Sequence, residues 1–201
     1  YTAVLYLEPF SGRNLRAFGF DMSPEPVRWA AAARARDNGE AALSGKVILQ
    51  QETGVDVQAG CVLFMPVYRS GMAHEDREQR RASLLGWVYS PLRMHDLMSS
   101  VLRTVEFDEL RTLLNVTIYD GEQRLPENLL FTLQPVAPAA QPRFQMVQQL
   151  RFGGHPWTMV VSSTAGFEAR TQEEKVPLIA VGGSLVSLLL AVLSGLLILN
   201  H

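Results

Sequence analysis

The sequence is poor in cysteine, in net charge and in catalytic motifs. Its single thiol, Cys61, excludes an intrachain disulfide and a zinc site built from cysteines. Cys61 lies in the apolar run GCVLFMPVY, which predicts a small buried side chain. The formal net charge is −2 and no basic stripe is present, so the sequence gives no reason to expect a nucleic acid as partner.

The short motifs that carry most enzyme chemistry are also missing. The chain contains no GxSxG, no HExxH, no CxxC and no glycine-rich phosphate loop. Its four histidines are not spaced as metal ligands. We therefore expect no catalysis, no metal and no cofactor in this segment. The closest approach to a catalytic pattern is a carboxylate pair of Glu8 and Asp21, whose separation the sequence does not give.

Charge is absent from one long stretch, residues 176–199 (VPLIAVGGSLVSLLLAVLSGLLIL). As a helix it would be about 36 Å long, whereas the hydrocarbon core of a bilayer is about 30 Å thick. We therefore expect a transmembrane helix at 176–199. Its glycines and serines are typical of a helix–helix contact in a dimer, and equally of residues merely tolerated in lipid. The chain has no initiator methionine and begins at Tyr1, directly before the run TAVLYLEP, which predicts a strand, so we interpret the sequence as part of a longer protein.

The residues before this stretch predict an α+β fold of two antiparallel-sheet modules. In the first module, residues 1–104, Ser23 is a candidate N-cap for a helix that Gly39 ends. The mixed-charge run HEDREQRR, residues 74–81, predicts a solvated loop. The expected elements of this module are strands at 3–7, 46–51, 61–69 and 83–92 and helices at 26–39 and 94–105.

The second module, residues 105–170, repeats this theme in smaller form. The segment TAGFEARTQEEK predicts a linker, and its residues 171–175 separate the module from the apolar stretch. The expected elements are strands at 115–121 and 127–133, a proline-rich loop at 134–142 and a hairpin around Gly153 and Gly154.

Asp21 is the most informative single residue, because it follows the aromatic run AFGF and precedes the first expected helix. It can cap that helix, although Ser23 competes for this position, or pair with Arg28 or Arg34. Alternatively, a carboxylate beside an aromatic pocket accepts N–H bonds from a planar heterocycle. The candidate pocket walls are Phe18, Phe20, Phe64 and Met65.

Together these features resemble the CHASE domain, the cyclase/histidine-kinase-associated sensory extracellular domain. The strong part of the resemblance covers residues 4–100, and beyond it only the architecture is similar. The family implies two PAS-like modules, distal then membrane-proximal, of which the distal one is N-terminally incomplete here. The residues that carry the resemblance are Glu8-Pro9, Gly19-Phe20-Asp21, Arg28, Ala35 with Gly39, Leu49 to Glu52, Pro66-Val67-Tyr68 and the downstream GWVYSPLRMHDLM.

The resemblance further implies where the chain lies and what it does. Residues 1–175 would lie on the periplasmic side of a bacterial inner membrane, as the small-molecule sensor of a homodimeric receptor. A cytoplasmic histidine kinase or cyclic-nucleotide enzyme domain would follow His201. The alternative is a structural ectodomain that dimerises or binds a partner protein without a small ligand.

Plant cytokinin receptors form one branch of the family, in which an aspartate of the distal module holds an adenine-like ring. Asp21 falls at that position, Leu43 near a pocket leucine and Thr53 near a pocket threonine. On residue type alone, Leu43 is explained by a core position as well as by a pocket position. Thr53 is explained in the same way by an ordinary turn position. Asn38-Gly39 in place of Thr-Gly and a longer turn at 50–60 depart from that branch, so the ligand itself is not identified. The predicted ligand contacts are Asp21, Phe20, Leu43, Thr53 and Phe64.

Overall fold

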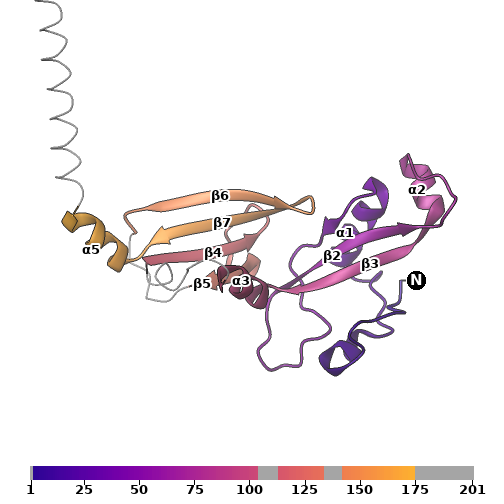
Figure 1. Cartoon of the computed structure of the whole chain (residues 1–201), viewed down its shortest axis with the longest axis horizontal. Helices are drawn as coiled ribbons and strands as arrows, with labels where there is room; N and C mark the ends of the chain where they lie inside the picture. The colour runs from indigo at the N-terminus through magenta and orange to yellow at the C-terminus, as the bar shows by residue number, and fades with distance from the viewer. Residues whose placement is uncertain (1, 104–112, 134–141, 175–201) are drawn as a thin grey trace, which may run out of the picture.

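The computed structural model of the protein describes residues 2–103, 113–133 and 142–174, and contains two antiparallel sheets placed end to end (Figure 1). The elements of the first part are the 3₁₀ helix η1 (Gly12–Ala17), α1 (Pro26–Asn38), β1 (Ala42–Leu43), β2 (Gly60–Tyr68), α2 (Arg77–Ser83), β3 (Leu84–Arg93) and α3 (Met94–Arg103). The elements of the second part are β4 (Leu114–Asp120), the 3₁₀ helix η2 (Pro126–Asn128), β5 (Leu129–Leu133), β6 (Gln145–Phe152), β7 (His155–Ser163) and α5 (Ala165–Glu174).

The first sheet has the strand order β1-β2-β3, and the second has the order β5-β4-β7-β6. The helix α1 lies against the first sheet, α3 lies between the two sheets, and α5 lies at the far end of the second (Figure 1). All strand pairs are antiparallel. The expected α+β fold with two antiparallel sheets is thereby confirmed.

The helix α1 forms where the sequence combines a proline at the first helical position with a run of alanines. Its N-cap is Glu25, whose carboxylate accepts hydrogen bonds from the backbone N–H groups of Val27 and Arg28. The expectation that Ser23 caps this helix is therefore wrong, because Glu25 occupies the capping position. Gly39 ends the helix as expected, in the left-handed conformation at φ 75°.

The first hydrophobic core lies between α1 and one face of the first sheet. Phe64 of β2 is fully buried there, against the alanines of α1. Its ring centroid lies 6.0 Å from that of Tyr89, the residue opposite it on β3. Trp87 packs against the same core, and its indole N–H donates to the carbonyl of Ala32 at 2.8 Å. This bond fixes the helix on the sheet through a group that would otherwise be buried without a partner.

The other face of the first sheet meets the tip of the β6–β7 hairpin, and this junction joins the two parts (Figure 1). The N–H of Leu43 donates to the carbonyl of Gly153 at 2.9 Å. The N–H of Lys46 donates to Asp120 Oδ2 at 2.9 Å, while Asp120 Oδ1 lies 2.7 Å from His155 Nε2. Residues of both parts form the second core, which includes Leu43, Cys61, Met94, Ile118, Phe131 and Trp157.

Cys61 is fully buried in this second core, as its apolar surroundings predict. Burial raises the pKa of its thiol to about 12, so the side chain behaves as a small apolar group.

Two expected strands are wrong. Residues 3–7 form only one isolated bridge, between Ala3 and Asp21, and residues 46–51 form only the bridge between Val47 and Gly60. Both segments are apolar and rich in β-formers. The N-terminal segment also exchanges backbone hydrogen bonds with residues 19–22, but neither segment extends its bridge into a ladder.

Two segments expected to be irregular contain helices. Residues 77–81 of the run at 74–81 belong to α2. Asp76 is the N-cap of this helix, because its side chain accepts a hydrogen bond from the N–H of Gln79. The expected linker at 164–175 contains α5, at whose start the hydroxyl of Thr164 accepts a bond from the N–H of Phe167. Neither helix was predicted, because both sequences are short and polar and neither shows the apolar periodicity of a core helix.

The stretch 176–199, expected to cross a membrane, lies outside the described residues, as does most of the proline-rich loop at 134–142. Within the described part of the chain, no helix is both long enough and apolar enough to span a bilayer.

Asp37, near the end of α1, ties this helix to α2 through arginine side chains. Its buried carboxylate accepts hydrogen bonds from Arg36 Nε at 2.7 Å, from Arg81 Nε at 2.9 Å and from Arg81 Nη2. Arg77 Nε lies 3.3 Å from its Oδ2. The bonds from Arg81 and Arg36 hold the pKa of Asp37 well below its ordinary value of 3.8.

We expect Asp37→Asn to lower the stability of the protein by about 1–2 kcal/mol at neutral pH, because the arginines lose a charged acceptor but remain partly solvated. The folded-state pKa lies below the unfolded value, so the carboxylate stabilises the protein above about pH 4. This contribution is lost as the pH falls through the folded-state pKa. Thermal unfolding measured across the acid range should show the two proteins converge below about pH 4, and a constant difference would contradict the prediction.

Candidate functional site

The carboxylate of Asp21 is fixed by four hydrogen bonds to one oxygen. Its Oδ1 accepts from the N–H (3.0 Å) and the hydroxyl (2.8 Å) of Thr2, and from the N–H (3.0 Å) and the hydroxyl (2.8 Å) of Ser23. The bond from the Ser23 N–H and that from the Thr2 hydroxyl lower the pKa of Asp21 far below its ordinary value, so it is ionised at neutral pH. Asp21 neither caps α1 nor pairs with an arginine among the described residues.

A cavity of about 290 Å³ lies beside the Thr2–Asp21 contact, between the N-terminal segment and β3. Because Asp21 Oδ1 binds both polar groups of Thr2, the carboxylate holds one wall of this cavity in place. The lining is mainly apolar and aromatic, which is typical of small-molecule sites. The lining residues are Thr2, Ala3, Val4, Leu5, Tyr6, Met22, Leu85, Gly86, Trp87 and Tyr89.

The two aromatic residues predicted to line a ligand site, Phe20 and Phe64, lie in the first core. Phe20 is partly buried, and the guanidinium carbon of Arg28 lies 5.5 Å from its ring centroid. Phe64 supports the cavity from behind, since it packs against Tyr89, which lines the cavity.

Leu43 and Thr53 lie elsewhere. Leu43 follows Ala42, the partner of Phe64 in the sheet, so its side chain points to the opposite face, where it is fully buried in the second core. Thr53 is exposed in the loop that precedes β2. None of the five predicted ligand contacts is itself among the residues that line this cavity. Phe64 lies in the first core, Phe20 packs against it, and Asp21 reaches the lining through its bonds to Thr2, whereas Leu43 and Thr53 lie elsewhere.

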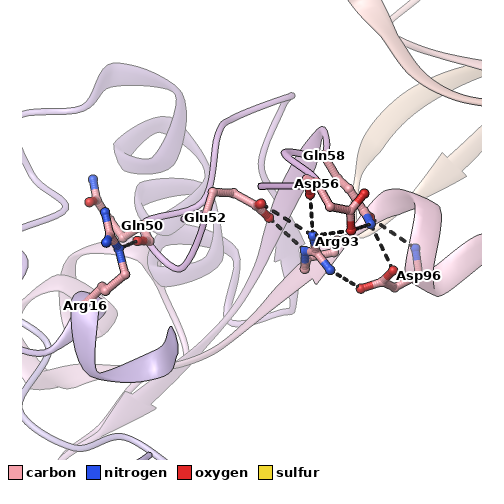
Figure 2. Close-up of polar contacts among 7 residues, drawn as sticks. All are labelled: Arg16, Gln50, Glu52, Asp56, Gln58, Arg93 and Asp96. Carbon is pink, nitrogen blue, oxygen red and sulfur yellow. Dashed lines mark hydrogen bonds and ion pairs between the residues drawn. The ribbon is translucent and has the colours of Figure 1, made fainter. Parts of the chain in front are cut away.

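A second polar cluster is centred on Arg93, the last residue of β3 (Figure 2). Its Nε donates to Glu52 Oε1 at 2.8 Å, its Nη1 donates to Asp96 Oδ2, and its Nη2 donates to the carbonyl of Asp56 at 2.7 Å. Gln58 Nε2 bridges the two aspartates, at 2.9 Å from Asp96 Oδ1 and 3.1 Å from Asp56 Oδ2. Arg93 Nη2 also lies 3.1 Å from Asp56 Oδ2, so one guanidinium contacts three carboxylates.

This cluster fixes the loop that carries Thr53 against the point where β3 passes into α3. The same loop is held at its other end by Arg16 Nε, which donates to the carbonyl of Gln50 at 3.2 Å (Figure 2). The bonds from Gln58, and then those from Arg93, lower the pKa values of Asp56 and Asp96. Among the described residues, no group of three or more His, Cys, Asp or Glu side chains is arranged to hold a metal ion.

Sequence reasoning singled out Asp21 but missed its partner Thr2 and the hub Arg93. Trp87 and Tyr89 line the cavity and also pack against the first core. The alternation in GWVYSPL does place both of them on one face of a strand, so this pair carried a usable signal. Arg93 carried none, because its principal partner stands 41 residues earlier in the chain.

Comparison with protein-family models matches the CHASE domain to residues 1–131. This range runs from the N-terminal segment beside Asp21 to β5 of the second sheet, and the match confirms the resemblance seen in the sequence. A search of curated proteins found no match.

Proposed function

Because this chain belongs to the CHASE domain family, the sensory extracellular domains of signalling receptors, we propose that it is the small-molecule sensor of a bacterial membrane receptor. In this proposal the two sheets are PAS-like modules, distal at 1–104 and membrane-proximal at 105–170. Residues 171–175 link them to a membrane span at 176–199, and residues 1–175 are periplasmic. The family is sensory rather than catalytic, so the segment itself is not an enzyme.

The observation that carries this proposal is the cavity of about 290 Å³ lined by Thr2, the hydrogen-bond partner of Asp21, and by Met22, its neighbour in the chain. It lies at the lower limit of ligand sites, roughly 300–1,000 Å³, so the proposed ligand is small, of one or two rings. Oδ1 of Asp21 is saturated, whereas no described residue donates a hydrogen bond to Oδ2. We assign Oδ2 to an N–H group of the ligand, as a planar, adenine-like heterocycle would offer.

The proposed signal passes from the cavity to the second part of the chain. The cavity is bounded by β3, which continues through Arg93 into α3, and α3 packs on β5. A ligand that binds one arrangement of the modules more tightly shifts the population of a homodimer, in proportion to that difference in affinity. The shift would reach a cytoplasmic histidine kinase or cyclic-nucleotide enzyme domain through residues 176–199.

A second candidate function is a structural ectodomain that dimerises or binds a partner protein. It is favoured by apolar side chains that the N-terminal segment leaves in solvent. Leu5 is 82% exposed, Tyr6 84% and Phe10 60%. A cluster of this kind is typical of a protein–protein contact.

A thermal-shift screen of the full chain in detergent micelles, against a panel of purines and other heterocyclic metabolites, separates the two functions. A ligand at about 100 times its dissociation constant stabilises the protein by about 2.7 kcal/mol, and so raises its melting temperature. We expect Asp21→Asn, which removes the charge but keeps an acceptor for Thr2 and Ser23, to weaken binding of that ligand at least about tenfold.

The matched control is Glu8→Gln, which neutralises an exposed carboxylate in the same N-terminal segment. It should leave the ligand-induced shift unchanged. If no compound in the panel raises the melting temperature while light scattering shows a stable dimer, the structural function is correct and the sensor proposal fails.

A further inference from the structure

The second sheet carries a larger cavity, of about 590 Å³, at the end where α5 lies. Apolar side chains from three strands and the helix line it, among them Leu114, Met146, Val161 and Phe167. The sheet register pairs Val161 with Met146 on one side and with Val116 on the other. The cavity therefore occupies the same face of the sheet as the second core, at the end remote from the first sheet.

Apolar side chains remain exposed at this cavity. Phe144 is 45% exposed and Met146 is 52% exposed. The rings of Phe144 and Phe167 meet almost at right angles, with centroids 5.9 Å apart, and form one wall. An apolar hollow bordered by exposed apolar side chains indicates a site for an apolar partner.

Arg143 is the one charged side chain among the residues that line the cavity, and Glu168 lies nearby but outside the lining. Arg143 lines the cavity, and its guanidinium carbon lies 5.5 Å from the centroid of the Phe144 ring. It forms no ion pair with a described residue, and no carboxylate is among the lining residues. The nearby acid, Glu168, is already occupied by the Ser163 hydroxyl and by the backbone N–H of Arg143. An amphiphile with an anionic head complements this arrangement.

The position of the cavity along the chain indicates where such an amphiphile would come from. Thr171 lines the cavity, and the uncharged stretch 176–199 begins five residues later. Five residues span at most about 18 Å, even when fully extended. This step rests on the proposed function, in which residues 176–199 cross the membrane. A span at this position places the cavity at the bilayer surface.

We propose that this cavity binds one acyl chain of an anionic membrane phospholipid, whose phosphate lies at Arg143. The bound lipid would attach the second sheet to the membrane surface beside the span. Ligand-driven movement of the modules would then work against this attachment, so the lipid composition would tune the receptor.

The test places a bimane label at position 146 through Met146→Cys, in the full chain reconstituted in nanodiscs. The bilayer is phosphatidylcholine with phosphatidylglycerol that carries a doxyl quencher on its acyl chain. Val147→Cys is the matched control, because Val147 is 47% exposed and points to the opposite face of the same strand. We expect quenching at position 146 to exceed that at position 147 roughly twofold or more. The buried Cys61 does not compete for the label.

Arg143→Gln should reduce quenching by labelled phosphatidylglycerol to the level seen with labelled phosphatidylcholine, since the variant removes the partner of the extra charge. Equal quenching at positions 146 and 147 in inserted protein would overturn the lipid site and leave the sensor proposal standing. Failure of the full chain to insert into nanodiscs would overturn both. If a second copy of the chain shields the label at position 146, so that the labelled lipid does not quench it, lipid binding is also refuted.

Discussion

Gly153→Ala should separate the two parts of the molecule, and it is expected to lower the melting temperature by roughly 5–10 °C more than the same change at Gly154. A Cβ at position 153 would lie 2.7 Å from the backbone N of Leu43 and 3.1 Å from its Cβ. That N–H is the donor to the Gly153 carbonyl, so the hairpin tip must move away from β1 and break the bond. The nearest atom is a backbone nitrogen, which cannot move aside as the end of a flexible side chain can.

Gly154→Ala is the matched control, because both glycines have a positive φ, 53° and 68°, which an alanine adopts only with strain. A Cβ at position 154 meets no atom within 4 Å. The difference between the two variants therefore reports the close approach to β1 and β2, chiefly to Leu43 and also to the Leu63 side chain at 3.2 Å. Hydrogen exchange should show the Leu43 amide protected in Gly154→Ala and exposed in Gly153→Ala. Equal melting temperatures and a protected amide in both would refute this account of the junction.

The Gly153 contact also bears on signalling, because few backbone bonds join the parts. In the described residues, the junction consists of the Leu43–Gly153 bond, the bonds of Lys46 to Asp120 and to the Glu127 carbonyl, and the shared second core. If the proposed sensor acts through the relative position of its two sheets, Gly153→Ala should uncouple ligand binding from output while the cavity beside Asp21 stays intact. The junction and the cavity lie on opposite faces of the first sheet.

Elements with strong local signals were predictable from the sequence. The alanine run and Gly39 define α1, the β-branched and aromatic runs define β2 and β3, and the paired glycines define the β6–β7 turn. The helices α2 and α5 were missed because polar residues dominate them and only a cap marks where each begins. Residues 3–7 show the opposite error, a predicted strand that the structure does not contain. Their continuous apolar run predicts a strand, yet Leu5 and Tyr6 are exposed, because strand formation depends on a partner that the local sequence does not specify.

The candidate site shows the same division. Asp21 was identifiable because a carboxylate after an aromatic run needs an explanation. Its true partner, Thr2, is 19 residues away, and the short side chain of a threonine gives no sign of such a contact. Leu43 was assigned to the pocket from its position in the family motif, whereas strand alternation turns it to the face that meets the hairpin.

Arg93→Ala is expected to destabilise the protein by about 3–5 kcal/mol, because it leaves a buried carboxylate without its cation. The side chain of Glu52 is only 4% exposed and that of Arg93 is 14% exposed, so this pair is shielded from solvent. The bonds to Asp56 and Asp96, which are 71% and 55% exposed, add little by themselves. Their contribution is geometric, since they hold the loop on α3 with Asp56 at a positive φ of 54°.

The charge argument predicts that a second substitution restores stability. Glu52→Gln in the Arg93→Ala background removes the buried charge, so the double variant should melt above Arg93→Ala alone. Arg93→Lys should lie between the native protein and Arg93→Ala, because one ammonium cannot reproduce the fork of bonds to three acids. Arg13→Ala, at an exposed arginine with no described partner, should change the melting temperature little. A loss of stability in Arg93→Ala that Glu52→Gln does not restore would contradict the charge argument. Because β3 passes into α3 at Arg93, the guanidinium would then stabilise the protein by packing at the β3–α3 junction and not by neutralising Glu52.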